Sequence, residues 1–287
     1  MPRRAAPKAV RPQAASSAKM VLEWFGDHAP AEVTREECRA YIAARRAAGR
    51  RDATIRNELS ILKAALNWRD PKGPHVVELP PAGPPRERFL SREEVARLLE
   101  AAAPTPHVAL FVQIAIATGA RRGAILEMTW STHVDLERGA IWPGFRPGGK
   151  NRAKPIPMTA SLARALAEAR EAAQGPYVVE WAGKPVKTIR RALAAAYARA
   201  GVTDVAAPAH VLRHTAGAWM AMAGVPLHEI AVRLGHSTIR VTERHYAHLA
   251  PEAMARSTAA LELGGYFMPS GSIEPQPVNA KGTKRTK

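Results

Sequence analysis

A proline-rich stretch at residues 71–85 divides the chain into two parts that fold separately. It holds six prolines and two glycines. Proline lacks the backbone N–H that a helix interior needs, so no helix crosses this stretch and an extended connector is favoured. We therefore predict a basic, disordered arm at 1–15, a helical domain at 16–70, a linker at 71–87, a larger domain at 88–268 and a basic, disordered tail at 269–287.

The charge of the chain indicates a polyanionic partner. Lys and Arg number 42 against 25 Asp and Glu, a formal net charge of +17. Neutralisation of phosphates dominates the affinity of proteins for nucleic acids, so such an excess favours DNA or RNA. Charge that only keeps the protein soluble is the alternative. A packing protein of ribosomal or chromatin type would not need the 46% of apolar residues found here.

The single cysteine and the absence of long apolar runs favour a cytoplasmic protein without membrane contact. Cys38 is the only cysteine, so no internal disulfide forms, and its place in an amphipathic stretch predicts a core position. No secretory segment and no run of about 18 apolar residues is present.

Three helices are expected in the helical domain. The first has an apolar cluster of Val21, Leu22, Trp24 and Phe25, and Thr34 with Glu37 forms a capping box that opens the second. Asp52 is expected to cap the third, whose inward positions are Ile55, Leu59, Leu62, Leu66 and possibly Trp68. Basic residues remain outside and predict a DNA-binding surface: Arg45, Arg46, Arg50, Arg51, Arg56 and Lys63.

The larger domain is expected to be mainly helical with a small antiparallel sheet. Ser91 and Glu94 form another capping box, and the apolar run 106–118 predicts a buried helix that breaks at Gly119. Short strands at 140–142 and 154–158 flank a glycine-rich hairpin, and the prolines of the second indicate an edge strand. Further helices are predicted at 160–173, 187–200, 209–223, from 226 to 234, before Tyr246 and at about 251–263.

Polar side chains of the larger domain predict chemistry on a phosphodiester. Arg121 and Arg213 each present a planar fork that suits the oxygens of one phosphate. Tyr246 would be the nucleophile, and His210, one helical turn before Arg213, is the best candidate for the base that takes its proton. Lys150 in the hairpin would protonate the leaving sugar oxygen, with Lys154 as the alternative, and Arg152 lies between them as a DNA contact. No carboxylate cluster suggests magnesium, so the expected reaction needs neither metal nor ATP.

Other histidines and core residues have simpler interpretations. His210 and His214 have the spacing of two zinc ligands, but no third ligand follows. His214 is expected to be a packing residue, and His245 and His248 to lie on the surface. Trp219 and Met222 have the helical spacing of core residues.

At this point the sequence resembles the tyrosine recombinases, specifically the phage-type integrases. The resemblance is carried by Thr118-Gly-Ala-Arg121, His210-x-x-Arg213-His214, Leu234-Gly-His236-Ser and the residues around Tyr246. It implies that Arg121, Arg213, His210, His236, a hairpin lysine and the nucleophile Tyr246 form the active site. It also implies a 3′-phosphotyrosine intermediate without cofactors, double-stranded attachment sites, a tetramer on DNA, and integration or excision of a phage or mobile element. An excisionase or a DNA-bending protein is a further candidate partner.

Departures from that family and three alternatives stay open. The family usually has an acid three residues after the first arginine, where this chain has Ala124. The step from His236 to Tyr246 is 10 residues, one longer than in many relatives. A DNA-binding regulator without catalysis is possible, since residues 230–245 fit a helix-turn-helix. A type IB topoisomerase would share the chemistry. The last expected helix, residues 253–263, either packs on its own chain or docks on a neighbouring subunit.

Overall fold

The computed structural model describes residues 12–83, 88–145 and 154–250 of the chain. Contacts between Cα atoms divide the chain into two units, one within residues 1–86 and one within 87–287. Each unit has its own buried core. The expected arm at 1–15, apart from its last residues, and the expected tail and final helix lie outside the described residues. The exact domain limits stay a prediction.

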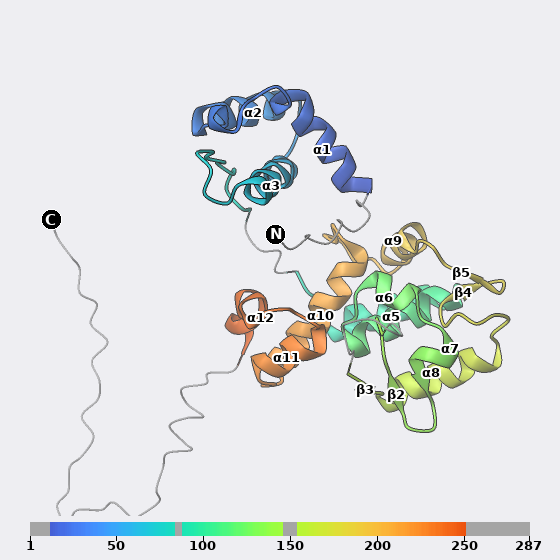
Figure 1. Cartoon of the computed structure of the whole chain (residues 1–287). Helices are drawn as coiled ribbons and strands as arrows, with labels where there is room; N and C mark the ends of the chain where they lie inside the picture. The colour runs from blue at the N-terminus through green and yellow to red at the C-terminus, as the bar shows by residue number, and fades with distance from the viewer. Residues whose placement is uncertain (1–11, 84–87, 146–153, 251–287) are drawn as a thin grey trace, which may run out of the picture. The chain divides into compact units, whose positions relative to one another are not determined.

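Unit 1 is built from three helices around one small core. They are α1 (Pro12–Phe25), α2 (Arg35–Ala47) and α3 (Asp52–Arg69), with a 3-10 turn η1 (Pro30–Glu32) after the first (Figure 1). The Thr34 hydroxyl accepts from the Glu37 N–H and caps α2, as expected. Cys38, Tyr41, Ile55 and Leu59 are almost completely buried, so the helices close on a continuous apolar interior.

Three details of the sequence prediction for this unit are wrong. Leu22 is 68% exposed, at the edge of the buried face of α1, and Trp68 is 69% exposed, because it lies more than 100° around α3 from the buried apolar positions. Asp52 does not cap α3. It is the first helical residue, and its carboxylate accepts two hydrogen bonds from the Arg46 guanidinium instead.

The predicted basic surface of unit 1 is also only partly correct. Arg45 turns inward and forms two hydrogen bonds with the buried carboxylate of Glu58, at 2.7 and 3.0 Å. Tyr41 donates to the same carboxylate, and these bonds outweigh burial and lower the pKa of Glu58. Arg56 donates to the carbonyl of Pro80. Exposed basic residues of the predicted set are therefore Arg46, Arg50, Arg51 and Lys63.

The segment after α3 is irregular but attached to unit 1. Residues 75–83 contain neither helix nor strand. Val76 donates its N–H to the Val33 carbonyl at 2.8 Å, and Val77 and Leu79 pack against the core of the unit. The proline-rich stretch therefore covers part of unit 1, in addition to connecting two units.

Unit 2 consists of helices packed around a buried pair, with a small sheet at one side (Figure 1). The pair is α5 (Pro106–Thr118) and α10 (Pro208–Met222). The remaining helices are α4 (Arg92–Ala102), α6 (Arg122–Leu126), α7 (Trp130–His133), α8 (Ala160–Glu171), α9 (Arg190–Arg199), α11 (Leu227–Leu234), α12 (Ile239–Tyr246) and a 3-10 turn η2 (Ala247–Leu249). Mainly helical architecture with small antiparallel sheets confirms the expected fold class.

The larger sheet has three very short antiparallel strands in the order β1–β2–β3. They are β1 (Val134–Asp135), β2 (Ala140–Ile141) and β3 (Ile156–Pro157). Ile141 pairs with Val134 on one side and Ile156 on the other. Because β3 is an edge strand, Pro157 costs no ladder hydrogen bond, as the sequence predicted. A separate hairpin joins β4 (Glu180–Trp181) to β5 (Lys184–Pro185).

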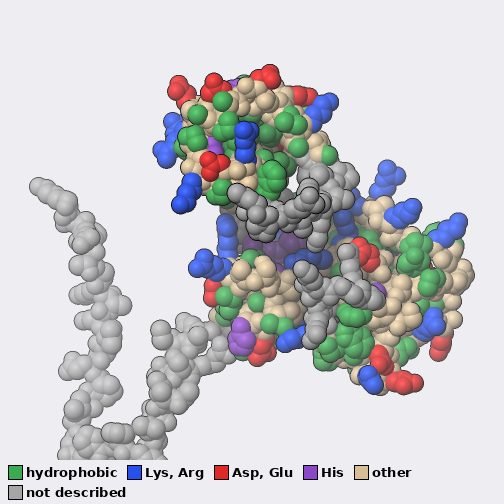
Figure 2. All heavy atoms as spheres, viewed as in Figure 1, with side chains coloured by type: hydrophobic (Ala, Val, Ile, Leu, Met, Phe, Trp, Pro, Cys, Tyr) green, Lys and Arg blue, Asp and Glu red, His purple; other side chains and the backbone are tan. Residues whose placement is uncertain are grey.

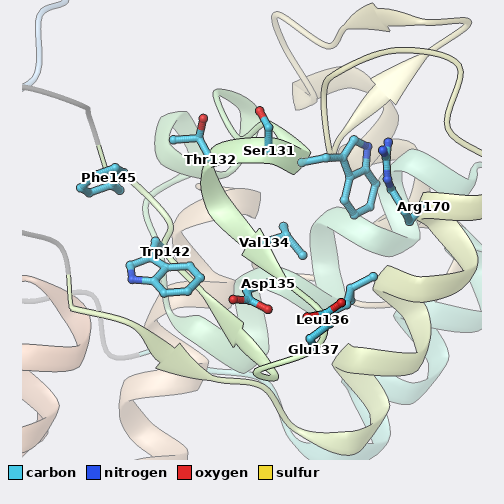
Figure 3. Close-up of a pocket in the computed structure, with 10 residues that line it drawn as sticks. Ser131, Thr132, Val134, Asp135, Leu136, Glu137, Trp142, Phe145 and Arg170 are labelled. Carbon is cyan, nitrogen blue, oxygen red and sulfur yellow. The ribbon is translucent and has the colours of Figure 1, made fainter.

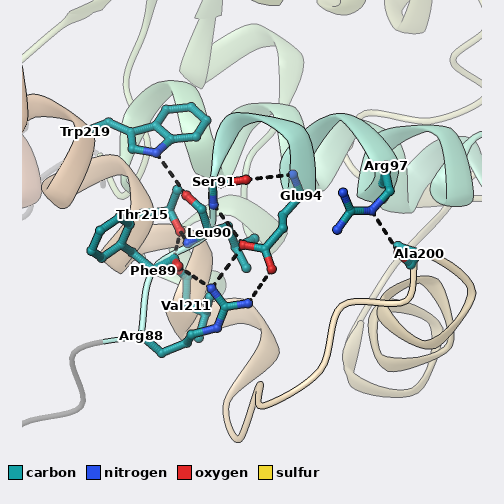
Figure 4. A network of polar contacts seen from close by, with 10 residues as sticks. All are labelled: Arg88, Phe89, Leu90, Ser91, Glu94, Arg97, Ala200, Val211, Thr215 and Trp219. Atoms are coloured by element: carbon teal, nitrogen blue, oxygen red, sulfur yellow. Dashed lines mark hydrogen bonds and ion pairs between the residues drawn. The ribbon is translucent and has the colours of Figure 1, made fainter.

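Residues 88–91 attach the start of unit 2 to α10 (Figure 4). The Leu90 N–H donates to the Thr215 hydroxyl at 2.9 Å, and the Trp219 indole donates to the Leu90 carbonyl at 3.0 Å. Ser91 and Glu94 form the expected capping box, and Arg88 pairs with Glu94. Trp219 is thus a packed residue as predicted, whereas Met222 faces solvent because it lies at the last, outward turn of α10.

Nothing in the described helices indicates a membrane span. Each of them is too short or too polar to cross a bilayer.

The buried pair of Arg45 and Glu58 gives a direct test of unit 1. Arg45→Ala leaves a carboxylate buried without its cation, so we expect the local stability of α3 to fall by about 3 kcal/mol. Arg46→Ala removes an exposed pair and should cost about 1 kcal/mol or less. Hydrogen exchange of the α3 amides in the full chain measures both changes. Equal small losses would contradict a structural role for Arg45.

Candidate active site

Gly119 sets the direction of the chain before Arg121. It ends α5 with φ +66°, a left-handed conformation that glycine adopts without strain. A Cβ at this position would also collide with the Leu234 side chain of α11. Arg121 follows in extended conformation as the N-cap of α6, and its side chain makes no capping hydrogen bond to that helix. Its Nη2 donates to the Gly235 carbonyl at 3.1 Å.

Arg213 connects the two turns on which the other polar groups lie. Its side chain comes from the middle of α10 and is buried, with 6% exposed. Nη1 donates to the Gly119 carbonyl at 2.8 Å and Nη2 to the Leu234 carbonyl at 2.6 Å. Burial and the charge of Arg121 lower the pKa of Arg213 to about 10, so the guanidinium stays charged at neutral pH.

His236 lies directly after the two carbonyls that the arginines bind. Gly235, with φ +66°, ends α11 and turns the chain toward α12. The His236 Nδ1 forms a 2.8 Å hydrogen bond with the Thr242 hydroxyl, so that only Nε2 remains to contact a phosphate. Burial, followed by the charges of Arg213 and Arg121, lowers the pKa of His236 to about 4.

Tyr246 is the last residue of α12 and is packed inside the unit. Only 3% of it is exposed, in a small core with Ala218, Ala221 and Leu234. Its ring lies against Gly217 of α10, because a Cβ there would stand 2.6 Å from the hydroxyl oxygen. Burial raises the pKa of Tyr246 to about 12, against the opposing charge of Arg213.

Three further histidines form a chain of ring contacts that reaches the tyrosine, and the sequence assigned only His210 of them to the site. The His214 ring is 5.4 Å from that of Tyr246, 5.5 Å from His210 and 5.2 Å from His245, centroid to centroid. His210 is exposed on α10 and His214 is buried. Burial and the neighbouring positive groups lower the pKa of His214 to about 4.

The prediction that His245 lies on the surface is wrong. It is partly buried, its Nδ1 is shielded from solvent, and burial lowers its pKa. Its ring is 5.2 Å from that of His214 and 6.2 Å from that of Tyr246, centroid to centroid. His248 is exposed, as expected.

The base of the predicted hairpin is fixed by His133 of α7. Its Nδ1 accepts from the Thr129 N–H at 3.0 Å, so the neutral ring carries its proton on Nε2, which donates to the Phe145 carbonyl at 3.0 Å. Ala124 packs near Gly144 at the same end of the hairpin: a Cβ added at Gly144 would stand 3.4 Å from the Ala124 Cβ. Lys150 and Arg152 lie outside the described residues. Lys154 is exposed two residues before β3.

A hollow of about 560 Å³ beside the sheet, here named the β1–β2 hollow, is separate from these groups. Figure 3 shows Trp142 and Phe145 on one side of it and Arg170 on the other. Arg121, Arg213, His236 and Tyr246 do not line it. The candidate site is therefore the convergence of α6, α10, α11 and α12.

The geometry brings together four of the residues that the sequence singled out. Arg213 donates to the Leu234 carbonyl and Arg121 to the next carbonyl, at Gly235. The positive charge of Arg213 favours a lower pKa for both His236 and Tyr246. Such a set suits a phosphate with a nucleophile beside it. Within the described ranges, no three His, Cys, Asp or Glu side chains gather as a metal ion requires.

Sequence reasoning missed Gly217, Thr242 and the contact of His214 with Tyr246. A glycine inside an otherwise regular helix was the available signal for Gly217, since it costs helix stability unless something packs against it. Thr242 gave no comparable signal.

The fold of this chain is that of integrase structures. An integrase of transposon Tn1549 in complex with a circular intermediate DNA matches over 88% of this chain and 94% of its own, with a TM-score of 0.70 at 16% identity. A lambda integrase tetramer bound to a Holliday junction matches over 83% and 70%, with a TM-score of 0.59 at 18% identity.

The sequence then gives the family. The model of the phage integrase family matches residues 88–253, and the chain belongs to this family. It is 28% identical to the integrase of Salmonella phage P22 over 82% of this chain and 63% of that protein. It is 30% identical to the tyrosine recombinase XerD of Rhizobium meliloti over 71% and 70%. The chain thus spans less than two thirds of the P22 protein.

A substitution at Gly217 tests how tightly the Tyr246 ring packs against α10. Alanine normally stabilises a helix interior by up to about 1 kcal/mol over glycine. Gly217→Ala should instead cost about 2 kcal/mol, because its methyl group overlaps the Tyr246 ring. Gly123→Ala in α6, where a Cβ meets nothing within 4 Å, is the matched control and should be neutral or stabilising. Urea unfolding of unit 2 measures both. A stabilised Gly217→Ala would show that the ring packs elsewhere.

Proposed function

We propose that this chain is a site-specific DNA recombinase of integrase type, which breaks and rejoins strands through a phosphotyrosine link without metal or ATP. The observation that carries the proposal is that Tyr246 packs against Gly217 of α10, the helix that bears Arg213, while Arg213 and Arg121 hold the turn that presents His236. Membership of the phage integrase family supports it.

The reaction conserves the energy of the broken bond. The Tyr246 oxygen attacks the phosphorus of one phosphodiester, a new O–P bond forms, and the bond from phosphorus to the 5′ oxygen breaks. The 3′ end becomes linked to the tyrosine and the 5′ hydroxyl leaves. Arg121 and Arg213 stabilise the charge on the non-bridging oxygens, and His236 hydrogen-bonds one of them. Attack by a different 5′ hydroxyl reverses the step and joins a new pair of strands.

Proton transfer has to accompany the attack. A phenol with a pKa of about 12 is almost wholly protonated at neutral pH, so a base must accept the proton as the O–P bond forms. We assign this role to His210, one helical turn before Arg213; the His214 ring contacts both the His210 ring and the Tyr246 ring. We assign protonation of the leaving oxygen to Lys150, with Lys154 as the alternative.

Tyr246 must become accessible before it can react. With 3% of its surface exposed, its hydroxyl cannot meet a DNA phosphate where it lies. Movement of α12, which carries the tyrosine at its end, would expose it. In this proposal the free protein keeps its nucleophile buried and protonated.

The proposed substrate is double-stranded DNA carrying attachment sites, held by both units. Lys and Arg side chains are spread over the visible surface (Figure 2), and in unit 1 Arg50, Arg51 and Lys63 are exposed. A homotetramer on DNA is proposed by analogy with the lambda integrase tetramer on a Holliday junction. Integration or excision of a phage or mobile element, inside a bacterial cell, fits the relatives.

A DNA-binding regulator is the main alternative. Helices α11 and α12 with the turn at Gly235 have the outline of a helix-turn-helix. Both arginines, however, bind carbonyls in this turn, which ties it to the catalytic groups. A type IB topoisomerase would use the same chemistry but relax supercoils without exchanging partners.

Covalent trapping tests the proposal. Purified protein is mixed, without metal, with nicked duplexes from the flanks of its own gene, and adducts that survive detergent are digested for peptide mass analysis. We expect DNA linked to Tyr246. Tyr246→Phe should lose the adduct, by at least about a thousandfold, while DNA affinity changes less than about threefold.

Tyr177→Phe is the matched control and should retain the adduct. An adduct on another residue, or equal loss of binding and cleavage in Tyr246→Phe, would refute the assignment. Binding without any adduct, on every duplex tested, would favour the regulator.

A further inference from the structure

One stripe of α10 forms the bed on which the Tyr246 ring lies. His210, His214, Gly217 and Ala221 follow one another at spacings of four, three and four residues, which places them on one side of the helix. A Cβ added at Gly217 would stand 2.6 Å from the Tyr246 hydroxyl oxygen, so the missing side chain makes room for the ring. Ala221 belongs to the same small core as Tyr246. His214 lies one turn before this gap.

His214 joins α10 to the end of α12 through its ring. The centroid of the imidazole is 5.4 Å from that of Tyr246 and 5.2 Å from that of His245, and both contacts are edge-to-face. Aromatic rings favour this arrangement. On its own helix His214 contacts the His210 ring at 5.5 Å. Only 7% of the His214 surface is exposed, so these rings are its main surroundings.

This position suits a neutral imidazole and opposes a charged one. Within the described residues the His214 ring forms no hydrogen bond and no ion pair with a carboxylate. A protonated ring would carry two N–H donors without acceptors in a buried place, which costs free energy. Burial, followed by the neighbouring positive groups, lowers the pKa of His214 to about 4. The ionisable groups that face it are His210 and Arg213 on α10, His245 and Tyr246 on α12, and His236 after α11.

We propose that His214 is a positioning residue for the nucleophile: its neutral ring holds Tyr246 against α10, and a positive charge on that ring releases α12. It acts through Tyr246 and not on the DNA. Because the packed ring excludes a proton, its stabilising contribution is complete above about pH 6.5 and is lost as the pH falls toward 4. The role of Tyr246 as nucleophile rests on the proposed function, but the release of α12 can be measured without DNA.

Amide hydrogen exchange of the full chain at pH 7 and pH 5 tests this role. Protection is taken relative to the intrinsic exchange rate at each pH. One excluded proton predicts that residues 239–246 lose about 20-fold of their protection between pH 7 and pH 5. Helix α9 contains no histidine and packs against α4, so it is the internal reference and should change less than about threefold.

Uncharged replacements of His214 separate its charge from its packing. His214→Phe keeps a ring against Tyr246 but takes up no proton, so the loss of α12 protection at pH 5 should shrink to less than about threefold. His214→Gln is the second variant and should also remove the pH response, even where it lowers protection at pH 7. His228→Gln, at an exposed histidine of α11, is the matched control and should keep the full response.

Two results would overturn the proposal. One is an α12 helix whose protection does not fall selectively at pH 5, either because nothing changes or because α9 loses protection equally. The other is an unchanged pH response in both His214→Phe and His214→Gln, which would assign the release to another group. A selective response that depends on His214, in a protein that never forms a DNA adduct, would support the positioning role and refute the proposed function.

Discussion

The guanidinium of Arg213 is the contact on which the rest of the candidate site depends. Its two hydrogen bonds join the Gly119 turn to the end of α11. Burying a cation is costly, so the group is retained only where its donors find acceptors, and here both acceptors belong to turns that carry site residues. Gly119 leads to Arg121, and Leu234 leads to His236. A single side chain therefore sets the positions of two others.

The same interaction explains the electrostatics of the site. Burial lowers the pKa values of His214 and His236, and the charge of Arg213 acts in the same direction on both, as does that of Arg121 on His236. The free protein thus has two fixed positive charges, neutral imidazoles at His214 and His236, and a protonated tyrosine in one place. A phosphate diester supplies the negative charge that this arrangement lacks. The Leu90 backbone forms hydrogen bonds with the Thr215 and Trp219 side chains and so connects the start of unit 2 to the helix that bears Arg213.

Much of this could be predicted from the sequence because it depends on local rules. The capping box at Ser91, the buried helix at 106–118 and the glycine stops at 119 and 235 follow from backbone geometry and hydrophobic spacing. Arg121, Arg213, His236 and Tyr246 were found through their motifs. The inward turn of Arg45 toward Glu58 was not predictable, since it depends on a partner 13 residues away in another helix. The contact of His214 with Tyr246 likewise arises only from packing between separate helices.

Hydrogen exchange on Arg213→Lys tests whether Arg213 organises the site. A lysine ammonium cannot span both carbonyls, so we expect faster amide exchange at residues 119–121 and at 234–236 together, with unit 1 unchanged. Arg233→Lys, whose parent side chain donates to the Ala117 carbonyl, is the control and should not loosen both turns. Unaltered protection at both turns, alongside loss of the covalent adduct, would contradict this role. Arg213 would then act on the phosphate alone and would not organise the site.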